Sequence, residues 1–320
     1  MERRGRRCGL WMIGAITSIV GALLVPGLAN ASGPIRAADG EPDNDTRLSV
    51  LTPAQAAFVR QKQAIADAIG AAAVQAAKTG PYQVAQPSFQ CETDPCSGPP
   101  PTPSPTAPPP SSAPPPSGPP SSRMLETRAR QQTTYYYCGP AAGQVVINYS
   151  RGIVIFDRTK AGAEDPSINW RKQSTIAGWM KTTVDGTGGA NIAAALNRAD
   201  AVLKPVSSWV YAYVDSGTRA NFHGMIVTDV ATYGMPVIVA TAPHQADAGS
   251  NYLTSWPDVY DGAHHWITVR GYTGLPGSSG PTMSYNDSSG TFGGSTGTFT
   301  DYVSVLWQVN DWNQGGHLVW

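Results

Sequence analysis

The sequence predicts an α+β fold for residues 123–320, behind three segments of different character. Helical patterns come first in this C-terminal part and strand patterns dominate its end. That order is typical of an α+β domain with an antiparallel sheet and not of a doubly wound sheet. Eight of the nine tryptophans also lie there, so this part has the apolar content for one substantial core.

The first 31 residues have the pattern of an export signal. Four arginines lie within the first seven residues, an apolar stretch covers residues 10–25, and Ala29-Asn30-Ala31 offers a cleavage site. The apolar stretch is broken by glycines and is short for a membrane-spanning helix. We therefore expect residues 1–31 to be removed and the mature protein to be secreted without a membrane anchor, by the general or the twin-arginine route.

Charge and motif content exclude several classes of partner. Removing residues 1–31 takes four arginines and one glutamate from 22 basic and 22 acidic residues, which leaves a net charge of −3. Binding to nucleic acid, or to an anionic membrane surface, would require a basic face. Neither C-x-x-C nor H-E-x-x-H is present, and the adjacent His264 and His265 would face opposite sides of a strand. We therefore expect no nucleic acid, no catalytic metal and no other cofactor.

Residues 32–96 contain one clear helical pattern, over residues 53–78. Thr52 and Pro53 suit the N-cap and first position of a helix, and Gly80-Pro81 suits its end. A single helix cannot form its own core, so it must dock on the C-terminal domain, pair with another chain or remain marginal. A removable pro-segment and an anchoring helix are both open at this point.

Residues 97–122 form a proline-rich linker. Thirteen of its 26 residues are proline, and none is charged or aromatic. Such a segment cannot bury a core. It is expected to be a semi-rigid polyproline II spacer, up to roughly 80 Å long at about 3.1 Å per residue.

Apolar periodicity predicts the elements of the C-terminal domain, and no internal repeat is evident. The predicted helices cover residues 139–149, 174–182, 190–199 and 218–232, and the predicted strands cover residues 207–214, 236–241, 265–272, 281–286 and 301–309.

Cys138 is the most informative residue in the chain. Cys8 leaves with the signal, and Cys91 and Cys96 can close a small disulfide loop in an oxidising compartment, which leaves Cys138 without a disulfide partner. It precedes a Gly-Pro step that begins an apolar helical segment, and the N-terminus of a helix favours a thiolate. A buried structural cysteine or a different disulfide pairing are the alternatives to a nucleophile.

A nucleophilic cysteine needs a base, a group that orients the base and donors for the oxyanion. Of five histidines, His265 has the most suggestive position, at the start of an apolar strand. Asp287 ends a following strand, and an antiparallel pairing of the two strands would bring it near His265. His264 is the alternative base, although it would face the opposite side of the strand. Asp287 could also simply cap a turn.

These residues resemble the papain-like cysteine peptidases of the C39-like, stand-alone secreted type. The pattern Q-x5-C-G-x-A is met by Gln132 and Cys138-Gly139-Pro140-Ala141. A histidine, an aromatic residue and an apolar strand ending in Gly-Tyr are met by residues 265–272. The family's aspartate usually precedes proline, whereas Asp287 precedes a serine. The likeness spans roughly residues 128–310 and covers neither the linker nor the N-terminal helix.

The resemblance implies a papain-like fold, with N-terminal helices packed on an antiparallel sheet, and hydrolysis of peptide bonds through an acyl-enzyme. Cys138 would be the nucleophile, His265 the base and then the acid, and Asp287 the group that orients His265. Gln132 and the backbone N–H of Cys138 would form the oxyanion hole. The substrate would be a peptide or protein, and the enzyme would be extracellular or associated with a cell wall. Two alternatives are a papain-like amidase acting on cell-wall peptides and a non-catalytic surface binding module on a peptidase-like fold.

Overall fold

The computed structural model describes residues 51–79, 118–153, 170–243, 252–256, 263–290, 294–313 and 316–320. The expected signal, the Cys91–Cys96 disulfide and most of the proline-rich linker lie outside these residues. Everything described below belongs to one compact unit within residues 41–320. Within the described ranges, no helix combines the length and the apolar character needed to cross a membrane.

An antiparallel sheet forms the centre of the domain. Its order is β2-β7-β3-β4-β5-β6, and β1 pairs with the far end of β4. The strands are β1 (Ser122–Met124), β2 (Tyr213–Asp215), β3 (Val237–Thr241), β4 (His265–Thr273), β5 (Thr282–Ser288), β6 (Thr296–Tyr302) and β7 (His317–Val319). All residues of β3 and nearly all of β4 and β5 are buried, so these three strands carry the middle of the core.

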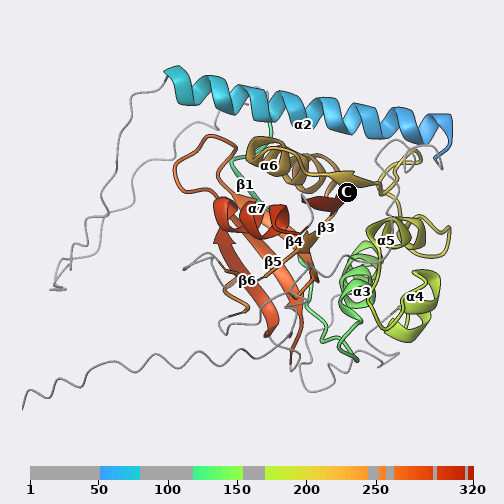
Figure 1. Cartoon of the computed structure of the whole chain (residues 1–320). Helices are drawn as coiled ribbons and strands as arrows, with labels where there is room; N and C mark the ends of the chain where they lie inside the picture. The colour runs from blue at the N-terminus through green and yellow to red at the C-terminus, as the bar shows by residue number, and fades with distance from the viewer. Residues whose placement is uncertain are drawn as a thin grey trace, which may run out of the picture. The chain divides into compact units, whose positions relative to one another are not determined.

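Helices gather around this sheet in two groups. The helices are α2 (Pro53–Thr79), α3 (Cys138–Ser150), α4 (Gln173–Trp179), α5 (Gly189–Leu196), α6 (Arg219–Val227), the π-helix η2 (Thr228–Tyr233) and α7 (Val303–Asp311). Helices α3, α4 and α5 lie together at one side of the sheet, and α2 runs across α6 (Figure 1). Helices that precede an antiparallel sheet confirm the predicted α+β class.

Two predicted elements differ from the structure. The strand expected over residues 301–309 is wrong, because β6 ends at Tyr302 and α7 follows at once. Val303, Leu306 and Val309 are buried at helical spacing, and a short apolar run of this kind is compatible with a strand as well as a helix. Of the strand expected over residues 207–214, only its last residues pair in β2, although Ala212 exchanges backbone hydrogen bonds with Trp320.

Helix α2 docks on the C-terminal domain through a buried ion pair. The Lys62 ammonium lies 3.0 and 3.1 Å from the two carboxylate oxygens of Asp229 on η2, and both side chains are fully buried. The ammonium also lies 4.1 Å from the ring centre of Trp209 and 4.3 Å from that of Trp320. Burial lowers the pKa of Lys62, and burial outweighs the attraction of Lys62 to raise the pKa of Asp229 to about 6.

The crossing of α2 and α6 depends on small residues. A Cβ atom on Gly224 of α6 would lie 2.4 Å from the backbone oxygen of Ala66 on α2. Phe58 of α2 packs edge-on against the rings of Trp209 and Tyr233. Among the possibilities left open by the sequence, docking on the C-terminal domain is therefore the one that the structure shows.

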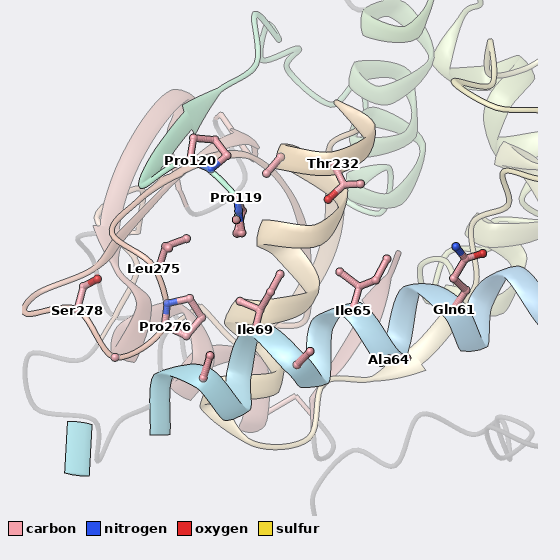
Figure 2. A pocket seen from close by; sticks show the side chains of 15 residues that line it. Gln61, Ala64, Ile65, Ile69, Pro119, Pro120, Thr232, Leu275, Pro276 and Ser278 are labelled. Carbon is pink, nitrogen blue, oxygen red and sulfur yellow. The ribbon is translucent and has the colours of Figure 1, made fainter. Parts of the chain in front are cut away.

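Helix α2 also forms one wall of an apolar groove of about 1200 Å³. Figure 2 shows Ile65 and Ile69 of α2 facing this groove, with Pro119, Pro120, Leu275 and Pro276 around it. None of the residues that line the groove is one of the four predicted site residues. The groove is thus separate from the candidate active site.

Candidate active site

Cys138 is the first residue of α3 and a buried free thiol. Its helix has no acidic residue in the first turn and no side-chain hydrogen bond at the N-cap. The positive end of the helix dipole is therefore not offset by a carboxylate. The glycine after it is required, because a Cβ on Gly139 would lie 2.8 Å from the side chain of Thr187. The start of α3 thus packs closely on the loop before α5.

His265 and Asp287 meet across neighbouring strands. His265 begins β4, Asp287 lies near the end of the antiparallel β5, and their Nε2 and Oδ1 atoms are 2.8 Å apart. The two residues are only 4% and 1% exposed. The Cys138 thiol also lies near enough to His265 to contribute to the raised pKa of that ring. Since Nε2 is engaged by Asp287, Nδ1 is the ring nitrogen left for the thiol.

The charges of His265 and Asp287 shift each other's pKa. Burial alone would lower the pKa of His265, but the charge of Asp287, the hydrogen bond that His265 donates to Asp287 and the nearby Cys138 together raise that pKa to about 10. Burial would likewise raise the pKa of Asp287, yet His265 and the hydrogen bonds from Ser289 and Ser255 hold it below its usual value. The site therefore holds an imidazolium beside a carboxylate at neutral pH.

Four donors surround the Asp287 carboxylate. Its Oδ1 atom accepts from His265 and from the backbone N–H of Ser289 at 2.9 Å. Its Oδ2 atom accepts from the Ser255 hydroxyl at 2.7 Å and from the Trp256 indole N–H at 3.0 Å. The Trp256 ring also lies against the His265 ring, with centroids 5.2 Å apart. These contacts fix the carboxylate in position and exclude water from the pair.

Gln132 lies close to these residues, but its side-chain amide already has hydrogen-bond partners. Its Nε2 atom donates to the backbone oxygens of Thr134 and Tyr135, each at 3.0 Å. Its Oε1 atom accepts from the Ser288 hydroxyl at 3.3 Å. Both amide protons are thus engaged by the loop that leads to Cys138, and Gln132 can serve an oxyanion only after one of these bonds is released. The N–H of Cys138 has no partner within α3, because it is the first residue of the helix.

The structure does not place the alternative base in the site and shows no metal site among the residues that it describes. His264 is exposed and forms a hydrogen bond with Asn313, so it faces away from the buried pair. Within the ranges that the structure describes, no group of three or more His, Cys, Asp or Glu residues could hold a metal ion. Sequence reasoning missed Ser255 and Trp256. They lie in a stretch that shows no apolar periodicity, and their nearness to Asp287 follows only from the fold.

A free cysteine at a helix start, near a histidine and an aspartate on an antiparallel sheet, agrees with the predicted papain-like class of folds. The profile of the Peptidase_C39 like family matches residues 124–314 of this chain, and the chain belongs to that family. A solved structure titled recombinant stem bromelain precursor is also similar, with a TM-score of 0.37 and 12% identity over 62% of this chain and 69% of that chain. A comparison with curated proteins gave no match.

Proposed function

We propose that this protein is a secreted cysteine peptidase that hydrolyses peptide bonds through Cys138, His265 and Asp287. The observation that carries the proposal is the continuous chain of contacts from the Cys138 thiol through the His265 ring to the buried Asp287 carboxylate. Membership of a peptidase family supports it. A structural cysteine has no need of a buried imidazolium and a carboxylate saturated with donors beside it.

In the acylation step, the Cys138 thiolate attacks the carbonyl carbon of the scissile amide. The N-terminus of α3 and the neighbouring His265 imidazolium both place positive charge beside the attacking sulfur. His265 gives its Nδ1 proton to the leaving nitrogen, the C–N bond breaks and an amine departs. Asp287 keeps the ring oriented and stabilises its positive charge throughout.

In the deacylation step, the now neutral His265 takes a proton from water as the water oxygen attacks the thioester carbon. The C–S bond breaks, a carboxylic acid leaves and the thiolate–imidazolium pair is restored. The backbone N–H of Cys138 would stabilise the oxyanion in both steps. Gln132 would add a second donor on release of the Thr134 or Tyr135 oxygen. Loss of one such donor typically lowers the rate by about 10²–10³-fold.

The substrate proposed is a peptide or protein outside the cell, since residues 1–31 have the pattern of an export signal. The test compares the mature chain, Cys138→Ala and the matched surface variant His264→Ala on a casein-like protein and on purified peptidoglycan. We expect protein hydrolysis that falls by at least about 10³-fold in Cys138→Ala and is unchanged in His264→Ala. Cleavage of peptidoglycan alone would favour the amidase. Wild-type activity in Cys138→Ala would overturn the mechanism.

A further inference from the structure

Two of the four donors to Asp287 come from a short segment, Tyr252–Trp256, that is not part of the sheet. This 252–256 segment places Ser255 and Trp256 on the Oδ2 atom of Asp287. Ser255 is fully buried and Trp256 nearly so, and the backbone oxygen of Ser255 accepts from the N–H of Ser295 at 2.8 Å. The position of Asp287 therefore depends on what holds this segment against the sheet.

A second carboxylate, Asp301 on β6, holds the segment. Its Oδ2 atom accepts from the backbone N–H of Thr254 at 3.0 Å, and its Oδ1 atom accepts from the Thr254 hydroxyl. Oδ2 also accepts from the Tyr285 hydroxyl at 2.7 Å. One carboxylate thus binds the segment, by way of Thr254, and the sheet, by way of Tyr285.

The two hydroxyl groups between the carboxylates have fixed roles. Tyr285 and Ser255 have their oxygens 3.2 Å apart, and each has a carboxylate acceptor of its own. Burial and the charge of Asp301 raise the pKa of Tyr285, so this phenol keeps its proton and gives it to Asp301. The Tyr285 oxygen can then only accept, and the Ser255 proton is directed to Asp287.

We propose that Asp301 is a positioning residue of the active site, which holds the 252–256 segment so that Ser255 and Trp256 fix the Asp287 carboxylate against His265. The inference rests on the proposed peptidase function. Asp301 does not contact Cys138 or His265 through any of its hydrogen bonds, and it acts only through Thr254, Tyr285 and the segment. A loosened segment would leave Asp287 with fewer donors and His265 with a less firmly held partner.

The test variant is Asp301→Asn. In it an NH₂ group replaces one carboxylate oxygen, so that a hydrogen-bond donor faces a donor where the wild type has an acceptor. We expect kcat to fall roughly tenfold, about the effect of one hydrogen bond to a charged group, with KM unchanged. The alkaline limb of the kcat profile should move to lower pH, because a less constrained Asp287 stabilises the imidazolium less. Asp311→Asn, an exposed carboxylate on α7, should match wild type, and Thr254→Ser should too, since it keeps the hydroxyl and the N–H.

A second readout needs no substrate, namely the pH dependence of the rate at which iodoacetamide alkylates Cys138. Asp301→Asn should be alkylated more slowly than wild type at neutral pH, because a less stabilised His265 imidazolium is a weaker partner for the sulfur. If the wild type hydrolyses nothing, the proposed function fails while this readout still tests Asp301. A variant that melts at a lower temperature, yet keeps the wild-type kcat and alkylation profile, would show that Asp301 is purely structural and would overturn the inference.

Discussion

The buried pair between Lys62 and Asp229 offers a quantitative test of how α2 is held. Lys62→Met removes the ammonium and leaves a fully buried carboxylate without its counter-ion. Breaking one partner of such a pair typically costs about 3–5 kcal/mol of unfolding free energy. The cost should be smaller near pH 5 than near pH 8, because burial already raises the pKa of Asp229 to about 6 and a protonated carboxyl is the less costly form to bury.

The matched double variant, Lys62→Met with Asp229→Leu, replaces the ion pair with apolar side chains. It should recover most of the loss, to within about 1 kcal/mol of wild type. Urea unfolding followed by tryptophan fluorescence measures both, and the Trp209 and Trp320 rings beside Lys62 are among the tryptophans that report the transition. A loss below about 1 kcal/mol in the single variant, or a double variant no more stable than the single one, would refute a docking contribution from the pair.

Two further predictions concern the active-site pair and the helix crossing. Because the pKa of His265 is raised from 6.5 to about 10 and that of Asp287 is lowered, their mutual stabilisation is complete between roughly pH 4 and 6.5. It should decline as the pH rises toward 10 and as it falls below the ordinary aspartate range, and thermal unfolding of Asp287→Asn should show a weaker alkaline decline than wild type. Gly224→Ala should destabilise by more than about 1 kcal/mol, since its Cβ meets the α2 backbone. The control Gly178→Ala, which has open space, should be neutral or stabilising in the same urea assay, and equal effects would argue against a tight crossing.

The sequence predicts those helices and strands whose apolar residues recur with a clear period. The helix over residues 53–78 and the strand that begins at His265 agree with α2 and β4. The juxtaposition of His265 and Asp287 followed from antiparallel pairing of consecutive strands, which is a local rule of topology.

Other features depend on contacts that no local pattern encodes. Thr254 meets Asp301 and Lys62 meets Asp229 across 47 and 167 positions of the chain. Whether α2 docks on the domain could not be decided from its own sequence, because the surface that receives it consists of residues scattered through later elements. The helix α7 was misread because a short run of valine, leucine and tryptophan suits a strand as well as a helix, and tertiary packing decides between the two.

The serine after Asp287, where the family pattern has proline, links the two halves of the candidate site. The backbone oxygen of Ser288 accepts from the Gln132 N–H at 2.8 Å, and the Ser288 hydroxyl donates to the Gln132 side-chain oxygen at 3.3 Å. A proline there would keep the carbonyl acceptor but lose the hydroxyl. Since the Gln132 amide also binds the oxygens of Thr134 and Tyr135, Ser288 fixes the side chain that orders the loop before Cys138. The departure from the pattern therefore adds a hydrogen bond between the glutamine and aspartate motifs and does not by itself indicate a decayed site.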